Sequence, residues 1–218
     1  MLNKPQPSIS RFDNELNIQE VAFLNSLDTP FRIQTFLDTV LYPGGERNRS
    51  VIEVLRERQA HCLDGGMFAA ACLRRIGFPP LILDLVPEPG TDDDHVLALY
   101  KVDKCWGAVA KSNYSGLRFR EPVFRTLREL VMSYFEDFFN TSAQKTLRAY
   151  TRPFSLAKFD RFNWLTDSRG VDAVEKYLKT LPSIPVIHAA QISKLNILDK
   201  RSVDAGCLGL NPEGVFHG

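Results

Sequence analysis

The chain has 218 residues, of which 44% are hydrophobic and 24% charged, and this is the composition of an ordinary globular protein. Its 27 basic and 26 acidic residues leave a net charge of +1, so there is no electrostatic case for binding nucleic acid or an anionic membrane. No stretch approaches the roughly 18 apolar residues of a membrane-spanning helix, and the N-terminus lacks the apolar segment of a signal peptide. We therefore expect a cytoplasmic protein with free thiols.

The chain divides into three parts of different character. Residues 1–17 are polar and contain prolines, so we expect a loosely held, flexible arm. Residues 18–150 carry regular helix and strand patterns and form the expected core. Residues 151–218 contain more loops and no catalytic pattern, and we expect a C-terminal extension that packs on the core.

Four helices are predicted in the first half of this core. They cover residues 18–27, 31–41, 51–58 and 62–76. The last of them begins at Cys62, is rich in Ala and Leu, and ends before the C-cap glycine Gly77. Gly65 and Gly66 lie just inside it, although each disfavours helix by about 1 kcal/mol relative to Ala. Two such residues together predict a close approach, either by a substrate chain or by a neighbouring part of the fold.

A β-hairpin is predicted in the middle of the chain. The expected elements are strands at 81–86, 95–102 and 105–110, followed by a helix at 126–139. Asp103 and Lys104 form the predicted turn between the second and third strands, so that Val102 lies opposite Cys105. The aromatic residues of the helix at 126–139 are expected in the core.

Cys62 and His95 are the two residues whose positions point to chemistry. A cysteine at a helix start lies among unpaired backbone N–H groups, at the positive end of the helix dipole, and both favour the thiolate. His95 opens the strand at 95–102, and an imidazole beside a thiol is the usual means of activating that nucleophile. The ordinary alternative is that Cys62 is a small core residue and His95 the polar end of a charged loop.

Residues 31–113 resemble the transglutaminase-like superfamily of the papain-like cysteine enzymes. The resemblance rests on the order of its motifs, which are the helices at 32–42 and 51–58, the Cys62 helix with its ending Leu73-Arg-Arg-Ile-Gly-Phe-Pro-Pro80, His95, and Trp106 on the following strand. The segment 95–135 also looks like a bacterial branch of that superfamily. The resemblance implies an α+β fold in which helices pack on an antiparallel sheet.

The resemblance also implies an activity. Cys62 matches the nucleophile that forms a thioester, and His95 matches the general base that takes the thiol proton. The reaction would be acyl transfer or hydrolysis at an amide, isopeptide or ester, on a peptide or a small amide or ester substrate, with no cofactor. The family's third residue, an Asp or Asn that orients the imidazole, is expected about four residues after Trp106. Ala110 stands there instead.

The hairpin register suggests where the orienting residue lies. Counting outward from the turn, His95 faces Ser112, with Lys111 and Asn113 one step to either side. Asn113 is chemically the best of the three, since its carbonyl oxygen can accept from a ring N–H. Ser112, or no third member at all, are the alternatives, because a shift of one residue exchanges the faces of a strand.

Two other classes of function remain open. The missing Asp after Trp106 favours a catalytically degenerate binding module of the same fold. A metal protein with ligands Cys62, His61 and His95 is the weaker alternative, because adjacent residues rarely bind one tetrahedral ion together. We therefore expect no metal, and the sequence leaves the oligomeric state open.

Overall fold

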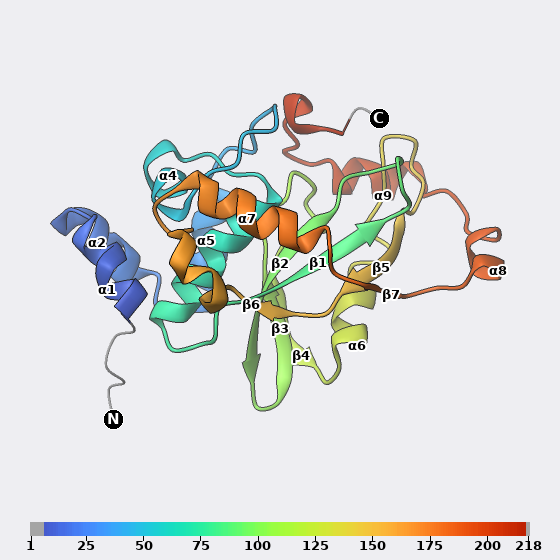
Figure 1. Ribbon diagram of the computed structural model, residues 1–218. Coiled ribbons are helices and arrows are strands. Elements are labelled where there is room, and N and C mark those ends of the chain that lie inside the picture. Colours follow the sequence, from blue (N-terminus) through green and yellow to red (C-terminus); the bar gives the residue numbers. More distant parts are fainter. Residues whose placement is uncertain (1–6, 217–218) are drawn as a thin grey trace.

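The computed structural model describes residues 7–216 and has the expected α+β fold. An antiparallel sheet with the strand order β4-β3-β2-β1-β5-β7 runs through the middle of the molecule (Figure 1). The strands are β1 (Leu81–Pro87), β2 (His95–Val102), β3 (Cys105–Val109), β4 (Arg120–Phe124), β5 (Leu147–Thr151), β6 (Phe154–Ser155) and β7 (Ser183–Pro185). The short β6 pairs with β1 beside this path.

Most of the helices lie on one face of the sheet. The α-helices are α1 (Pro7–Asn14), α2 (Ile18–Ser26), α3 (Pro30–Asp38), α4 (Val51–Glu57), α5 (Cys62–Arg75), α6 (Leu127–Met132), α7 (Ser168–Leu178), α8 (Ala189–Ile192) and α9 (Lys200–Gly206). Two 3-10 helices, η1 (Leu156–Phe162) and η2 (Pro212–Gly214), complete the set. Between residues 7 and 216, no helix has the length and apolar content needed to cross a membrane.

The predicted hairpin forms with the predicted register. Val102 lies opposite Cys105, and the ladder continues to Ala98 and Val109. Asp103 and Lys104 have φ angles of 47° and 68°. Both therefore adopt the left-handed conformation of a two-residue turn, whose twist matches that of the strands it joins.

Two apolar cores lie on opposite faces of the sheet, and the alternation of side chains along β2 separates them. Val96, Ala98 and Tyr100 belong to the larger core, together with residues of α1 to α5, η1 and α7. Leu97 and Leu99 belong to the smaller core, under α6 and the turns that follow it. Successive strand residues point to opposite faces, so the side of β2 on which a residue lies decides which helices it meets.

The close approach predicted at Gly65 and Gly66 is made by the hairpin. A Cβ atom at Gly65 would overlap the Cβ of Lys111, which follows β3. A Cβ atom at Gly66 would lie 2.8 Å from Cγ1 of Val96 on β2. The absence of side chains at these two positions therefore lets the first turns of α5 lie directly on the sheet.

Three expectations differ from the structure. Within the predicted arm, residues 1–6 lie outside the described residues, but residues 7–14 form α1, whose Phe12 is only 1% exposed. The helix predicted at 126–139 ends at Met132, and turns carry its buried aromatic residues into the smaller core. Residues 151–178 are not an added layer, because η1 and α7 contribute Leu156, Trp164 and other residues to the larger core.

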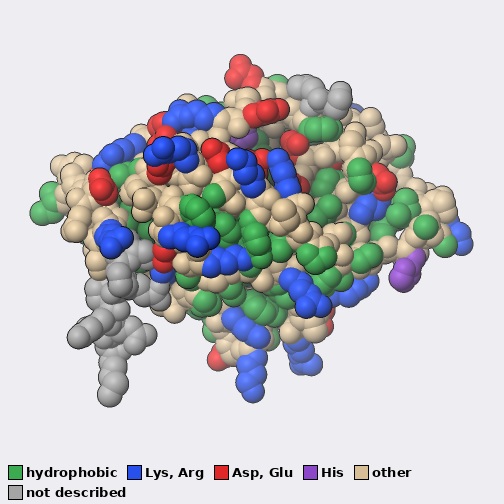
Figure 2. Space-filling view, viewed as in Figure 1, with side chains coloured by type: hydrophobic (Ala, Val, Ile, Leu, Met, Phe, Trp, Pro, Cys, Tyr) green, Lys and Arg blue, Asp and Glu red, His purple; other side chains and the backbone are tan. Residues whose placement is uncertain are grey.

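Charges of both signs are mixed over the surface. In Figure 2, Lys and Arg side chains lie among Asp and Glu over the face that carries α7, and apolar patches separate them. Some ion pairs of the described residues join two exposed side chains, such as Lys200 with Asp204 at 2.8 Å, and others have a buried member, such as Arg74 with Asp160 at 2.8 Å. On this face the mixture of charges agrees with the balanced composition of the chain.

Candidate functional site

The start of α5, where Cys62 lies, is fixed by a buried carboxylate. Asp64 is fully buried, and its side chain accepts hydrogen bonds from the backbone N–H groups of Arg49 at 2.8 Å and His61 at 3.2 Å. A carboxylate in the first turn of a helix satisfies donors that have no partner within the helix. Burial raises the pKa of Asp64 to about 6, against the lowering effect of these two hydrogen bonds. Cys62 is thus held in place as the first residue of α5.

The Cys62 thiol lies among groups that disfavour its ionisation. It is buried, and it donates a hydrogen bond to the backbone carbonyl of Asp94 at 3.6 Å. Burial raises the pKa of Cys62 strongly, and the nearby carboxylate of Asp94 raises it further. A hydrogen bond from the backbone of Val96 lowers the pKa but does not offset these effects. The thiol is therefore the neutral form at physiological pH, and a thiol is a poor nucleophile.

His95 lies on the other side of β2. Its Nε2 is 2.7 Å from the carbonyl oxygen of Leu117, and its ring centroid is 6.5 Å from that of Phe138. Both partners belong to the smaller core. A carbonyl oxygen only accepts, so Nε2 carries the proton of the neutral ring and Nδ1 carries the basic lone pair. Burial lowers the pKa of His95 to about 4.

The structure does not bring Cys62 and His95 into contact. The sulfur of Cys62 meets the main chain of Asp94 and Val96, on the side of the strand where α5 packs. The imidazole of His95, which lies between these two residues in sequence, points to the opposite side. The two residues begin α5 and β2 as predicted, but their side chains lie on opposite faces of β2.

The residues considered for the third position also bond elsewhere. The Asn113 carbonyl oxygen accepts from the backbone N–H of Asn211 at 2.8 Å, and its amide donates to the carbonyls of Asn211 at 2.9 Å and Gly214 at 3.0 Å. Ser112 accepts a bond from the backbone N–H of Tyr114 at 3.0 Å. The Asn113 side chain thus binds the C-terminal segment, and its bonds are not made to His95.

Lys111, the remaining neighbour in the predicted register, has a structural role. Its Nζ donates to the carbonyl of Leu37 at 3.0 Å and to that of Val40. These carbonyls lie at the end of α3, where a helix favours a positive charge. Burial lowers the pKa of Lys111 to about 8.

Two neighbours of Cys62 were not expected from the sequence. Tyr42 is half-buried, and the pKa of its phenol is raised by desolvation and by the proximity of Cys62. Asp84 lies opposite Val96 in the β1–β2 ladder and is 4% exposed, and its Oδ1 has no hydrogen-bond partner among the described residues. Burial raises the pKa of Asp84 well above its usual range, so its neutral form is favoured. The sequence signal for Asp84 is a lone carboxyl inside the apolar run 81–86.

A small cavity of about 40 Å³ lies beside His95. Its lining residues come from five separate parts of the chain, and they include Tyr42, Asp92, Asp94, His95, Asn113, Tyr114, Phe138, Gly214 and Phe216. Cys62 is not part of this lining. The C-terminal residues Gly214 and Phe216 form one wall, so this segment covers the cavity that contains the histidine.

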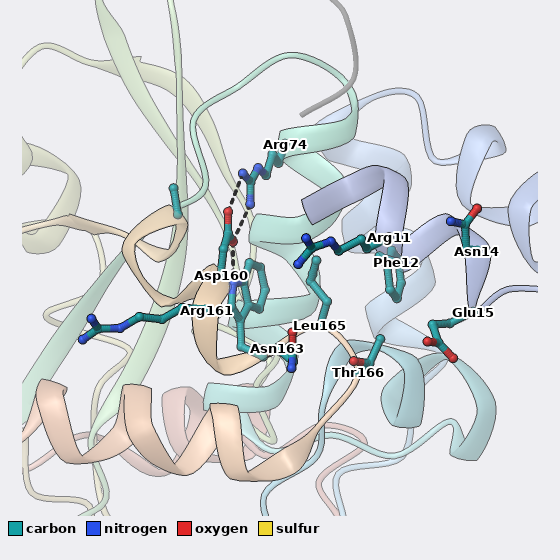
Figure 3. Close-up of a pocket in the computed structure, with 12 residues that line it drawn as sticks. Arg11, Phe12, Asn14, Glu15, Arg74, Asp160, Arg161, Asn163, Leu165 and Thr166 are labelled. Atoms are coloured by element: carbon teal, nitrogen blue, oxygen red, sulfur yellow. Dashed lines mark hydrogen bonds and ion pairs between the residues drawn. The ribbon is translucent and has the colours of Figure 1, made fainter. Parts of the chain in front are cut away.

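A larger cavity of about 750 Å³ lies elsewhere, between α1 and η1 (Figure 3). Arg74 spans to Asp160 with bonds of 2.8 and 2.9 Å, and the indole N–H of Trp164 donates to the same carboxylate at 3.0 Å. These side chains join the end of α5 to η1, and the charges of Arg74 and Asp160 pair with each other. Neither Cys62 nor His95 lines this cavity.

Metal binding has no support in the described part of the chain. Within residues 7–216, no group of three or more His, Cys, Asp or Glu side chains is placed to hold one ion. The hypothesis of Cys62, His61 and His95 as joint ligands is therefore wrong for this geometry, because β2 separates His95 from Cys62.

No protein-family model matches this chain, and no curated protein matches it.

Proposed function

We propose that this protein is a non-catalytic binding module, and that it uses an arrangement like that of the transglutaminase-like enzymes without their reaction. The observation that carries the proposal is the position of His95. Its imidazole lies across β2 from Cys62 and bonds to the Leu117 carbonyl at 2.7 Å. A general base must reach the proton that it removes, directly or through one water.

The surroundings of Cys62 support the same proposal. An activated cysteine has cationic or dipolar neighbours that lower the pKa of its thiol. Cys62 instead has the carboxylate of Asp94 nearby, which raises the pKa of the thiol in addition to the larger effect of burial. Two features favour the thiolate, namely the position of Cys62 at the start of the 14-residue α5 and the hydrogen bond from the Val96 backbone, and here burial outweighs both.

The binding role is supported by the surface between Tyr42 and Asn113. The Asn113 side chain bonds to both the N–H and the carbonyl of Asn211, and the Tyr42 carbonyl accepts from the Asn211 side chain at 2.8 Å. Polar groups on this surface thus recognise the main chain of a segment in irregular conformation. This is the arrangement expected of a site for peptide segments.

The competing proposal is acyl transfer or hydrolysis through a Cys62 thioester with His95 as the base. It requires His95 to turn to the other face of β2 when substrate binds, which would break its bond to Leu117. One measurement distinguishes the two proposals, namely the rate of alkylation of Cys62 as a function of pH.

In this experiment, iodoacetamide labelling is followed for each cysteine by peptide mass spectrometry, in the wild type and in His95→Gln. Cys105, which is half-buried on β3, serves as the reference thiol in the same sample. We expect Cys62 to react more slowly than Cys105 at every pH, and equally in both proteins. Rapid labelling of Cys62 at about pH 6–7 that is lost in His95→Gln would establish the thiolate–imidazolium pair and overturn the binding-module proposal.

A further inference from the structure

The C-terminal segment, residues 205–216, lies across a groove formed by two distant parts of the chain. We refer to residues 205–216 as the strap. One side of the groove is the loop 42–44, which precedes α4, and the other is the segment 113–115, which follows β3. The strap is attached to the second side by the backbone N–H of Ser115, which donates to the Gly206 carbonyl at 2.8 Å, and by the Ser115 hydroxyl.

The groove recognises the main chain of the strap. Asn113 accepts from the Asn211 N–H at 2.8 Å and donates to the Asn211 carbonyl at 2.9 Å, as an adjacent strand would. Its amide also reaches the Gly214 carbonyl at 3.0 Å. Bonds of this kind give affinity for an extended or turning peptide, while side-chain pockets give specificity.

Side-chain selection comes from two positions of the strap. The Asn211 side-chain amide donates to the Tyr42 carbonyl at 2.8 Å, so the groove favours an asparagine at this position of a peptide. At Gly214 a Cβ atom would lie 2.6 Å from Cδ1 of Tyr42 and 3.0 Å from the Pro43 carbonyl oxygen, so only glycine fits. On the groove side, a Cβ atom at Gly44 would lie 2.7 Å from the carbonyl oxygen of Glu213 in the strap.

The strap is joined to the rest of the protein by a weakly packed stretch. None of the residues from 187 to 216 is buried, and the helices α8, α9 and η2 contribute no buried side chain. In Figure 1 this stretch leaves the sheet after β7 and runs around the outside of the molecule through α8. Segments with few buried apolar contacts open at a low free-energy cost, so the strap can leave the groove without unfolding the core.

We infer that this groove is a peptide-recognition site, and that the strap is its intramolecular occupant. The partner that it fits is a peptide that turns between an asparagine and a glycine three residues later, as Asn211-Pro-Glu-Gly214 does through η2. Departure of the strap also removes Phe216 and Gly214 from the wall of the cavity beside His95, so that an apolar side chain of the partner can enter there. This inference rests on the proposed binding function and names its ligand class.

The test uses the full chain and a fluorescent synthetic peptide with the sequence of residues 208–216. The change Gly214→Ala expels the strap by its contact with Tyr42 and leaves every groove residue unchanged. We expect the peptide to bind Gly214→Ala at least about tenfold more tightly than wild type, because occupancy by the strap reduces the fraction of competent sites. Fluorescence anisotropy measures both affinities, and hydrogen exchange of the Ser115 amide reports whether the strap has left.

The matched control is Gly44→Ala on the groove side. It also displaces the strap, through its contact with the Glu213 carbonyl, but it blocks the groove, so the peptide should not bind. A peptide carrying Ala in place of the glycine should bind neither variant. Equal affinity of wild type and Gly214→Ala, binding by Gly44→Ala, or no binding by any protein would overturn the inference. Failure of this inference can be distinguished from failure of the proposed function, because the alkylation of Cys62 is measured without the peptide.

Discussion

His95 is a neutral imidazole that stabilises the smaller core. Burial lowers its pKa to about 4, the hydrogen bond to Leu117 opposes this shift, and the charge of Arg120 adds to it. At neutral pH the ring thus has one proton, on Nε2, and this proton bonds to Leu117 at 2.7 Å. The bond ties the start of β2 to the segment after β3.

This pKa predicts a loss of stability in acid. Between pH 6.5 and 4, the unfolded chain takes up a proton at His95 that the folded chain does not bind. Stability therefore falls as the pH falls through this window, by about 3 kcal/mol at its lower end. Asp64 and Asp92, whose pKa values are raised to about 6, act in the opposite direction.

The variant His95→Gln isolates the contribution of the histidine. Glutamine retains an N–H donor for Leu117 and has no charge in this range. We expect the free energy of unfolding of the wild type, minus that of the variant, to decrease between pH 6.5 and 4, since the two aspartates contribute equally to both proteins. Urea denaturation at a series of pH values measures this difference, and a pH-independent difference would contradict the expectation.

The elements that begin at Cys62 and His95 could be predicted from the sequence, but not the faces of β2 on which their side chains lie. Residue types and helix and strand signals place a cysteine at the start of α5 and a histidine at the start of β2, and the structure has both. A shift of one residue in strand register moves every side chain of the strand to the other face of the sheet. Here Val96, rather than His95, points toward α5, and the local sequence holds no signal for that choice.

At the scale of elements, α5 and the hairpin β2–β3 form a single packed unit. Local signals predicted its parts well, because the helix begins at its cysteine and the hairpin turn is at Asp103 and Lys104. The two glycines at the start of α5 were also correctly read as a close approach. Their partners are Lys111 and Val96, so the hairpin, not a substrate chain, fills that space.

This contact predicts unequal effects of two neighbouring substitutions. Alanine at Gly65 would overlap the Cβ of Lys111, which cannot rotate away, whereas alanine at Gly66 mainly meets a side-chain methyl group of Val96. Overpacking typically lowers the free energy of unfolding by about 1–3 kcal/mol, whereas the higher helix propensity of alanine raises it by about 1 kcal/mol. We expect Gly65→Ala to lower the free energy of unfolding clearly more than Gly66→Ala. Urea denaturation of the two variants tests this order, and a larger effect at Gly66 would contradict it.

At the scale of the whole molecule, the sheet is larger than local signals indicated. Strands were predicted only between residues 81 and 110, yet β4, β5 and β7 extend the sheet on both sides. β5 pairs with β1 from more than fifty residues away, with Leu85 opposite Tyr150. Pairing over such distances depends on the collapse of the whole chain and not on the propensity of five-residue segments. The same reason explains why residues 151–178 were expected as an extension and are part of the core.

The division of the molecule into a packed core and a peripheral C-terminal stretch predicts two levels of stability. Amides of α5, whose side chains are nearly all buried, should exchange only through global unfolding. The amides of Val203 in α9 and of Cys207, which caps its C-terminal end, should exchange through a local opening that costs far less free energy, because α9 buries no side chain. Native-state hydrogen exchange in increasing urea separates the two, since local openings depend little on denaturant. Equal protection and equal urea dependence in α5 and α9 would mean that the strap unfolds only with the core, and that its groove is not available to a partner.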